Sequence, residues 1–327
     1  MTTTPSLQSI ADPVLAAARA GDEGAFRALV APHLRALHVH CYRMLGSYTD
    51  AEDAVQESVL RAWRGLDGFR GTGPLPHWLY RISTTTCLKM INRRGRDPLS
   101  TATDVSWLQP YPDALLDELP VDDADPAAIV DRRQSVALAF VAALQLLPAT
   151  QRAVLILREV LDWPAREVAD LLDTSVAGVN SALQRARATL AAAPAREAAT
   201  TTIDDQQRHV LEAFLRAWHA ADMRALAALL REDVILSMPP QAIVITGRAA
   251  VADFFATVPA DGRLDLIRLV VTAANGHPAL AAYLPDRDGE CRGYGIMVLT
   301  IAGDGIATIT GFPSPDLFAI FGLPDSP

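Results

Sequence analysis

The chain has 327 residues, enough for two or three domains of ~100–200 residues each. Half of the residues are hydrophobic and 20% are charged, a balance that predicts folded cores and excludes a wholly disordered protein. Charged side chains interrupt the longest apolar stretch, residues 210–230, and residues 1–20 lack the pattern of a secretory signal, so we expect neither a membrane span nor export. Three widely spaced cysteines exclude a disulfide framework and fit a reducing cytoplasm.

Charge is distributed unevenly along the chain. The net charge of -9 by itself argues against a general nucleic-acid binder. However, residues 77–96 carry five basic side chains and no acidic one, whereas residues 97–131 carry nine acidic side chains and no basic one. This change of sign indicates a basic segment that adjoins an acidic one.

Residues 11–94 have apolar side chains at helical spacing, which predicts a helical region. Thr49 is the expected N-cap of one helix, with Glu52 three residues later completing a capping box. A break rich in glycine and proline over residues 65–76 predicts a loop. After the loop, an apolar stripe that begins at Trp78 predicts another helix, which carries the basic cluster.

The middle of the chain alternates between linker and helix. Residues 97–128 contain five prolines among the acids and too little apolar surface to fold alone, so we expect an extended linker. Helical spacing resumes over residues 129–193, with Pro148 and Pro164 at helix starts, and residues 194–203 are a second expected linker.

The last third of the chain changes character. Residues 204–230 predict a helix with one apolar face, and residues 248–256 a short one. The other apolar runs are β-branched or alternating and are bounded by Gly, Pro and Asp, which predicts strands at 234–236, 243–245, 264–271, 280–284, 294–301 and 306–309. Helices followed by sequential strands predict an α+β domain with a curved antiparallel sheet.

The clearest local motif is a helix-turn-helix over residues 163–187. Ala169 is the small residue at the helix contact, and Asp173 lies in the turn, where glycine is common because the backbone there is left-handed. Thr174 or Ser175 can cap the second helix, whose N-terminal part would enter the major groove of DNA. The pattern favours DNA binding over a plain helical hairpin.

Two other helix faces are candidates for binding. The basic helix indicates contact with nucleic acid, because Arg and Lys neutralise phosphates and aromatic rings stack on unpaired bases. Trp78 alone is expected in the core, so the charge cluster carries that prediction. On the preceding helix, Asp50, Asp53 and Glu57 share one face opposite the apolar stripe. This acidic face either docks a basic partner or is ordinary solvated surface.

Taken together, three segments resemble a known family: DAEDAVQE, the basic helix ending in Asn-Arg-Arg, and LPATQRAVLILREV followed by the helix-turn-helix. In this order they are similar to a bacterial sigma-70 family factor of the extracytoplasmic-function (ECF) class. The resemblance implies a multidomain fold with two all-α domains. A region 2 helical bundle would cover residues 10–96, an acidic linker 97–134, and a region 4 helix-turn-helix domain 135–193.

Residues 204–327 resemble a SnoaL-like domain of the cone-shaped α+β class, on the segments FLRAWHAADMRALAALLREDVILSMP and GRAAVADFF. Some relatives of such domains are isomerases or cyclases that use Asp/His acid–base pairs. The candidate groups here have no spacing that would pair them on one helix face: His209, His219, Asp253, His277 and Tyr283. A regulatory or ligand-sensing role is therefore favoured over catalysis and over a purely structural role.

The resemblance also assigns roles to residues. It implies that core RNA polymerase binds the acidic helix face through Asp50, Asp53, Gln56 and Glu57. It implies that the loop and the basic helix open and read the minus-ten promoter element through Arg70, Trp78, Arg81, Thr85, Lys89, Asn92, Arg93 and Arg94. The minus-thirty-five element would be read by Ser175, Gly178, Asn180, Ser181, Gln184 and Arg185, although the family usually carries more basic residues in this helix.

The main hypothesis is an ECF sigma factor that binds core RNA polymerase and promoter DNA in the cytoplasm, is regulated by its C-terminal domain and is not an enzyme. It implies no cofactor and no metal, and its acidic linker resembles those that thread towards the polymerase catalytic cleft. A small-molecule ligand of the C-terminal domain is a further candidate partner. Two alternatives remain: a SnoaL-like isomerase or hydrolase fused to a DNA-binding regulator, and a helix-turn-helix repressor that acts without polymerase.

Overall fold

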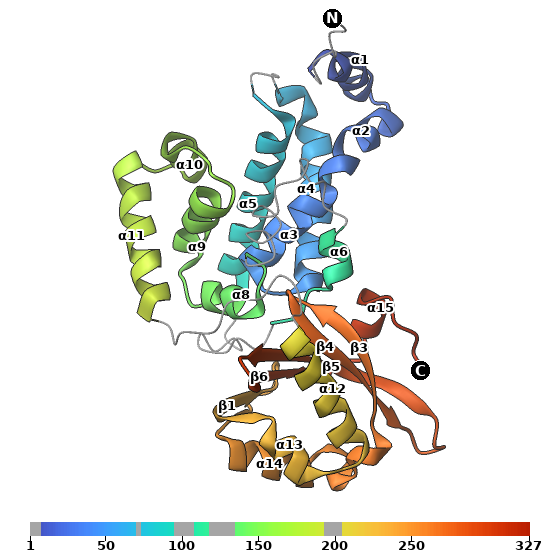
Figure 1. Cartoon of the computed structure of the whole chain (residues 1–327). Coiled ribbons are helices and arrows are strands. Elements are labelled where there is room, and N and C mark those ends of the chain that lie inside the picture. Colours follow the sequence, from blue (N-terminus) through green and yellow to red (C-terminus); the bar gives the residue numbers. More distant parts are fainter. Residues whose placement is uncertain (1–7, 70–72, 95–107, 118–134, 193–204) are drawn as a thin grey trace, which may run out of the picture. The chain divides into compact units, whose positions relative to one another are not determined.

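The computed structural model describes residues 8–69, 73–94, 108–117, 135–192 and 205–327 (Figure 1). The chain divides into two compact units, the first made of residues 1–101 with 144–192 and the second of residues 102–143 with 193–327. Helix α8 (Leu138–Gln145) crosses this division. Arg70 and most of the acidic linker lie outside the described residues.

The first unit is helical throughout its described part, in agreement with the prediction. Its elements are α1 (Gln8–Arg19), α2 (Glu23–Val30), a 3-10 turn (Ala31–His33), α3 (Leu34–Leu45), α4 (Tyr48–Gly65), a second 3-10 turn (Leu66–Gly68), α5 (Leu75–Arg94), α9 (Ala149–Leu155), a π-helical turn (Ile156–Val160), α10 (Ala165–Leu172) and α11 (Val176–Ala192).

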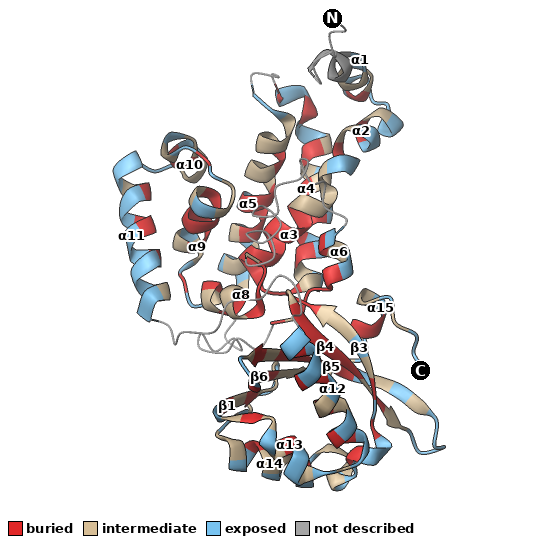
Figure 2. Cartoon of the chain, viewed as in Figure 1, coloured by how far each residue is buried: buried red, intermediate tan, exposed pale blue. Residues whose placement is uncertain are grey.

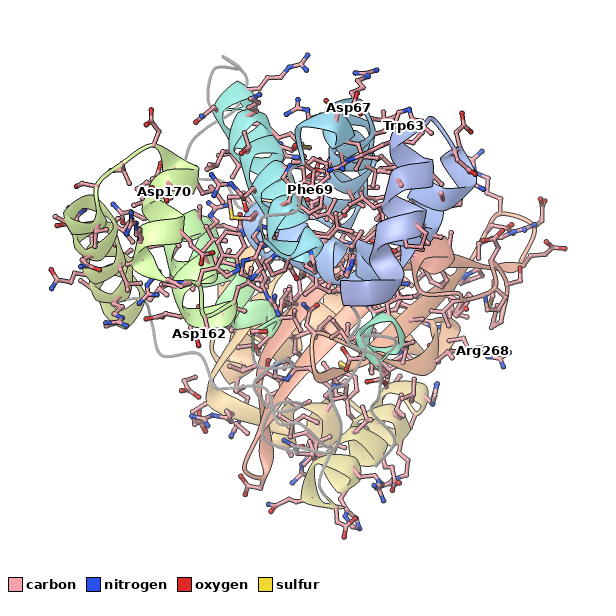
Figure 3. All side chains as sticks on the ribbon, turned by 90° about the horizontal axis from the view of Figure 1, so that it is seen from above. Trp63, Asp67, Phe69, Asp162, Asp170 and Arg268 are labelled. Atoms are coloured by element: carbon pink, nitrogen blue, oxygen red, sulfur yellow. The ribbon has the colours of Figure 1, made fainter. Side chains whose placement is uncertain are left out.

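Helices α3, α4 and α5 pack on one another and form the core of the N-terminal part. On α4 the buried side is made of small residues, among them Ala51, Ala54 and Ala62, and these let the neighbouring helices approach closely. At the end of α4, Trp63 meets Phe26 edge to face, and the ring of Phe69 lies 5.1 Å from that of Trp78 (Figure 3). The stretches 49–63 and 78–94 thus belong to one helical unit.

The cap of α4 differs from the prediction. Ser47 is the N-cap, and its Oγ accepts a hydrogen bond from the backbone N–H of Asp50 at 3.2 Å. Gly46 ends α3 in a left-handed conformation with φ 74°, so Ser47 is the first residue with extended backbone and a hydroxyl. Thr49 lies inside the helix, and the predicted capping box with Glu52 is therefore wrong.

The helix-turn-helix prediction is confirmed in its details. Asp173 ends α10 with φ 50°, the left-handed conformation that the turn requires. Ser175 Oγ accepts a hydrogen bond from the N–H of Gly178 at 3.0 Å and caps α11. Val168 and Val179 are fully buried between the helices.

The second unit combines helices with one six-stranded sheet. Its elements are α6 (Asp113–Asp117), α12 (Asp205–His219), α13 (Met223–Ala228), β1 (Leu230–Ser237), β2 (Val244–Thr246), α14 (Arg248–Thr257), two 3-10 turns (Pro259–Gly262 and Leu264–Leu266), β3 (Arg268–Ala274), β4 (His277–Pro285), β5 (Cys291–Ala302), β6 (Gly305–Phe312) and α15 (Leu317–Ile320). Residues 264–266, predicted as part of a strand, form a turn instead.

The sheet has the strand order β2-β1-β6-β5-β4-β3. Its pairs are antiparallel except β1 with β6, which run parallel, so the prediction of an antiparallel sheet is wrong for that pair. The last strand lies next to the first, and chain order alone did not reveal this neighbour. Helix α12 lies against the sheet (Figure 1). Its Phe214 and Trp218 are buried in the core that it shares with the sheet.

Candidate nucleic-acid interface

Helix α4 exposes a face that is acidic and has an apolar residue at its C-terminal end. Asp53, Gln56 and Leu60 are exposed, and 49% of the surface of Leu60 is accessible to solvent. Glu57 is half-buried and pairs with Arg61 at 2.6 Å. Asp50, at the start of the same face, forms an ion pair with Arg94 at the end of α5. The acidic face predicted from the sequence is thus present. The exposed Leu60 belongs to the same face and was not predicted.

Helix α5 exposes its C-terminal half. Thr85, Lys89, Asn92 and Arg93 are exposed at spacings that place them on neighbouring turns. Arg94 is partly buried because it pairs with Asp50. Helix α5 carries four Arg or Lys side chains and no acidic one, and Lys89 and Arg93 leave its exposed surface basic, as the sequence indicated.

The N-terminal half of α5 is covered by the helix-turn-helix. The ring of His77 stacks on Trp163 at 4.7 Å, and its Nδ1 lies 3.3 Å from a carboxylate oxygen of Glu167. Arg81 donates a hydrogen bond to the backbone carbonyl of Asp170 on α10 at 3.3 Å. The guanidinium predicted to contact the minus-ten element is therefore engaged within the protein in this conformation.

A buried arginine anchors the helix-turn-helix to the N-terminal helices. Arg152 of α9 is only 4% exposed, and it donates hydrogen bonds to the backbone carbonyls of Met44, Gln145 and Leu147. Met44 lies in the last turn of α3, where the helix leaves carbonyls without intrahelical partners. Burial lowers the pKa of Arg152 to about 10, so it is charged at neutral pH. The sequence gave no sign of this anchor, because Met44, the partner on the N-terminal helices, lies 108 residues away in the chain.

Helix α11 and its N-cap expose most of the residues that were predicted to read the minus-thirty-five element. Ser175, Asn180, Ser181, Gln184 and Arg185 are exposed, and Figure 2 shows this helix pale blue along most of its outer side. Ala182, Leu183 and Ala186 are buried towards α9. Gly178 is partly buried, and a Cβ at this position would lie 2.6 Å from Thr174 Oγ1, so the capped turn favours glycine.

Part of the expected linker is folded onto the C-terminal sheet. The backbone of Tyr111 exchanges two hydrogen bonds with Asn275, from Tyr111 N to Asn275 Oδ1 at 2.8 Å and from Asn275 N to Tyr111 O at 2.9 Å. Asn275 Nδ2 donates to Val136 O at 2.6 Å, and the N–H of Gly276 donates to Asp113 Oδ1 at 2.9 Å. We call these contacts the linker clasp.

The linker clasp holds residues on both sides of residues 118–134, the C-terminal part of the acidic linker. Asn275 and Gly276 form the two-residue turn between β3 and β4 with φ 56° and 74°, as an Asn-Gly hairpin turn requires. Asn275 is fully buried. The prediction of an extended linker is therefore wrong around Tyr111, which is buried. The turn between β3 and β4, far along the chain, supplies the hydrogen-bond partners of this segment.

The five candidate acid–base residues of the C-terminal domain are not brought together. His209, His219 and Asp253 are exposed on α12 and α14. His277 is buried beside the hairpin turn, and burial lowers its pKa to about 4. Tyr283 donates its hydroxyl to Pro324 O at 3.0 Å. Among the described residues, no group of three or more acidic, histidine or cysteine side chains could hold a metal ion.

Comparison with known families assigns three parts of the chain to family models. The chain matches the family models of Sigma-70 region 2 over residues 29–97, Sigma-70 region 4 over residues 137–190 and the SnoaL-like domain over residues 211–309. It is 41% identical over 321 residues to the ECF RNA polymerase sigma factor SigG of Mycobacterium tuberculosis, which covers 93% of this chain and 85% of that protein. The chain belongs to the ECF sigma factor family.

A further relative agrees with this membership, and a solved structure shares the fold. The ECF sigma factor SigM of M. tuberculosis is 31% identical over 178 residues, which cover 54% of this chain and 81% of SigM. The crystal structure of the ECF sigma factor SigJ of M. tuberculosis has the same fold, with a TM-score of 0.61 at 22% identity over 90% of this chain and 98% of that one. The SnoaL-like part of this ECF sigma factor is thus a fused domain.

Family membership decides between the hypotheses. An ECF sigma factor is a transcription factor that directs RNA polymerase to promoter DNA, and the alternative of an isomerase or hydrolase with a DNA-binding regulator is not favoured. No helix in the described part of the chain is long and apolar enough to cross a membrane.

Proposed function

We propose that this ECF sigma factor binds core RNA polymerase through the exposed face of α4 and promoter DNA through α5 and α11, in the cytoplasm. The observation that carries the proposal is the packing of α4 on α5, which leaves an acidic face on one helix and a basic face on the other. The polymerase face comprises Asp53, Gln56, Glu57 and Leu60, with Asp50 held by Arg94 at its edge.

Reversing one charge tests the polymerase face. Asp53→Arg places a positive charge in the middle of this exposed surface, and we expect core polymerase to bind the full chain at least ~10-fold more weakly, because like charges then meet across the interface. The matched control is Asp67→Arg, since Asp67 is an exposed aspartate beyond the end of α4 (Figure 3). Equal binding of core polymerase by Asp53→Arg and by the control would refute the assignment.

On α5, the proposed contacts to the minus-ten element follow from exposure and charge. The exposed part consists of Thr85, Lys89, Asn92 and Arg93, and the remaining proposed residues are Trp78, Arg81 and Arg94, which contact other parts of the protein here. Lys and Arg contact phosphates, whereas Thr and Asn hydrogen-bond to backbone and bases. The minus-thirty-five contacts are proposed on α11.

Reading both promoter elements requires the first unit to open. The minus-ten and minus-thirty-five elements are about 25 base pairs apart, which is ~85 Å at ~3.4 Å per base pair. A compact unit of about 150 residues has a radius of gyration of ~15 Å and is too small to reach both. The contacts of His77 and Arg81 with the helix-turn-helix therefore have to break when the factor engages a promoter.

The C-terminal domain is proposed to regulate the factor through the linker clasp. Asn275 holds the chain at Tyr111 and at Val136, two residues of the stretch of chain that joins the two sigma regions. Releasing the clasp removes both attachment points and lets the two regions separate.

We further propose that the C-terminal domain binds a small molecule and catalyses no covalent reaction. The separation of the candidate acid–base residues supports this view, since general acid–base catalysis requires such groups at one site.

A further inference from the structure

The second unit contains a cavity of about 180 Å³ between the sheet and helices α12 and α14. Trp218 lines it from α12, Phe254 and Phe255 from α14, and Tyr294 and Phe312 from the sheet. Protein interiors are packed with few voids larger than a water molecule, so an opening of this size within a core needs an explanation.

The lining of the cavity is apolar. None of the described side chains that line it is a carboxylate, an imidazole, a guanidinium, an ammonium or an amide. The indole N–H of Trp218 already donates to Ile267 O at 3.2 Å. The hydroxyl of Tyr294 is the remaining side-chain polar group, and Tyr294 is 43% exposed. A charged ligand would lose its hydration there without gaining a partner charge.

The aromatic rings of the lining are arranged at steep angles to one another. The rings of Trp218 and Phe255 meet at 5.4 Å and 74°, and those of Phe254 and Phe255 at 5.7 Å and 70°. Such an arrangement presents both ring faces and ring edges, and a further aromatic ring packs well in either orientation.

The volume limits the size of the ligand. An apolar cavity of ~150 Å³ stays dry and takes up benzene, so a slightly larger one suits a single ring with a short substituent. Val258, which is 58% exposed, and Tyr294 lie at the solvent-facing side of the lining and mark the entrance.

From these observations we infer that the cavity binds an uncharged, single-ring aromatic molecule. The inference deepens the regulatory role proposed for the C-terminal domain. Leu269 and Ala282, which pair across β3 and β4, line the cavity, and the turn at the other end of the same hairpin forms the linker clasp. The cavity and the linker clasp therefore share one hairpin.

The test measures binding of two probes to the full chain by titration calorimetry in the absence of polymerase. Ethylbenzene is expected to bind, and benzoate to bind at least ~10-fold more weakly, because its carboxylate finds no partner. Ala282→Leu adds a larger side chain to the lining and should lower the affinity for ethylbenzene at least ~10-fold. Ala307→Leu is the matched control, since Ala307 lies on β6 outside the lining.

A second variant adds a charge at the exposed entrance and leaves the core untouched. Val258→Arg provides a guanidinium for the benzoate carboxylate and should raise the affinity for benzoate ~10-fold or more. The inference is overturned if ethylbenzene does not bind the wild-type chain, if benzoate binds it as tightly, or if Ala282→Leu and Ala307→Leu bind ethylbenzene equally. Because polymerase is absent, these outcomes leave the promoter-directing function intact and are distinguishable from its failure.

Discussion

The linker clasp makes a quantitative prediction for Asn275→Gly. Glycine keeps the left-handed backbone at φ 56°, so the substitution removes the side chain without straining the turn. Two hydrogen bonds are lost, from Tyr111 N at 2.8 Å and to Val136 O at 2.6 Å, and both are buried. At ~1–2 kcal/mol for each buried bond, the clasp should be weakened by about 2–4 kcal/mol.

This loss should be measurable as faster amide hydrogen exchange in the full chain. A weakening of about 2–4 kcal/mol increases the opening equilibrium ~30-fold to ~1,000-fold, and the amide of Tyr111 reports it directly because that N–H is the donor to Asn275. Asp304→Gly is the matched control, since Asp304 lies exposed in the hairpin turn between β5 and β6.

An unchanged exchange rate at Tyr111 in Asn275→Gly would refute the reasoning, because the side chain would then not hold the linker. A rise of similar size in the Asp304→Gly control would also contradict it, since general loosening of the sheet would explain both. The comparison with Asn275→Ala adds a second check. Alanine at φ 56° costs about a further 1 kcal/mol in backbone strain, so its exchange should be faster than that of the glycine variant.

Three further predictions concern DNA contacts and pH. Arg93→Ala should weaken binding at all promoters and lower the slope of log K against log salt concentration by ~1, as measured by filter binding of the polymerase complex at several salt concentrations. Asn180→Ala should instead reduce discrimination at one position of the minus-thirty-five element by about 1–3 kcal/mol, measured with a set of single-base promoter variants. Burial lowers the pKa of His277 to about 4, from about 6.5 in the unfolded chain. Because the unfolded state then binds the proton more readily than the folded state, stability falls as the pH drops below about 6.5. Between pH 7 and pH 5 this effect lowers the free energy of unfolding by about 2 kcal/mol. Urea unfolding of His277→Gln at the two pH values should lack this decrease.

Local features of the fold could be predicted from the sequence because they depend on neighbours in the chain. The helix-turn-helix is an example, since the turn at Asp173 and the cap at Ser175 lie within a few residues of the helices they join. Where two local signals competed, the prediction failed, as it did for the cap of α4, which begins after Ser47 because Gly46 ends the preceding helix.

The candidate sites show the same limit. The exposed residues of α4, α5 and α11 could be proposed from spacing and charge, because a helix face follows from a period of 3.6 residues. Neither Leu60 on the polymerase face nor the pairing of Asp50 with Arg94 was visible in that pattern. Both depend on how α4 and α5 pack.

By itself, the sequence determined the order of the parts: a helical region, an acidic segment, a helix-turn-helix and an α+β domain, since periodicity and composition are properties of the local chain. Only the tertiary structure decided which side chains are exposed and which are engaged by other parts of the protein. Three hydrogen bonds join residues that are separated by about 90 to 160 positions in the chain. They run from Arg81 to Asp170, from Arg152 to Met44 and from Tyr111 to Asn275. Such contacts form because packing brings together polar groups that must be satisfied once they are buried, and no local pattern encodes which distant partner will satisfy them.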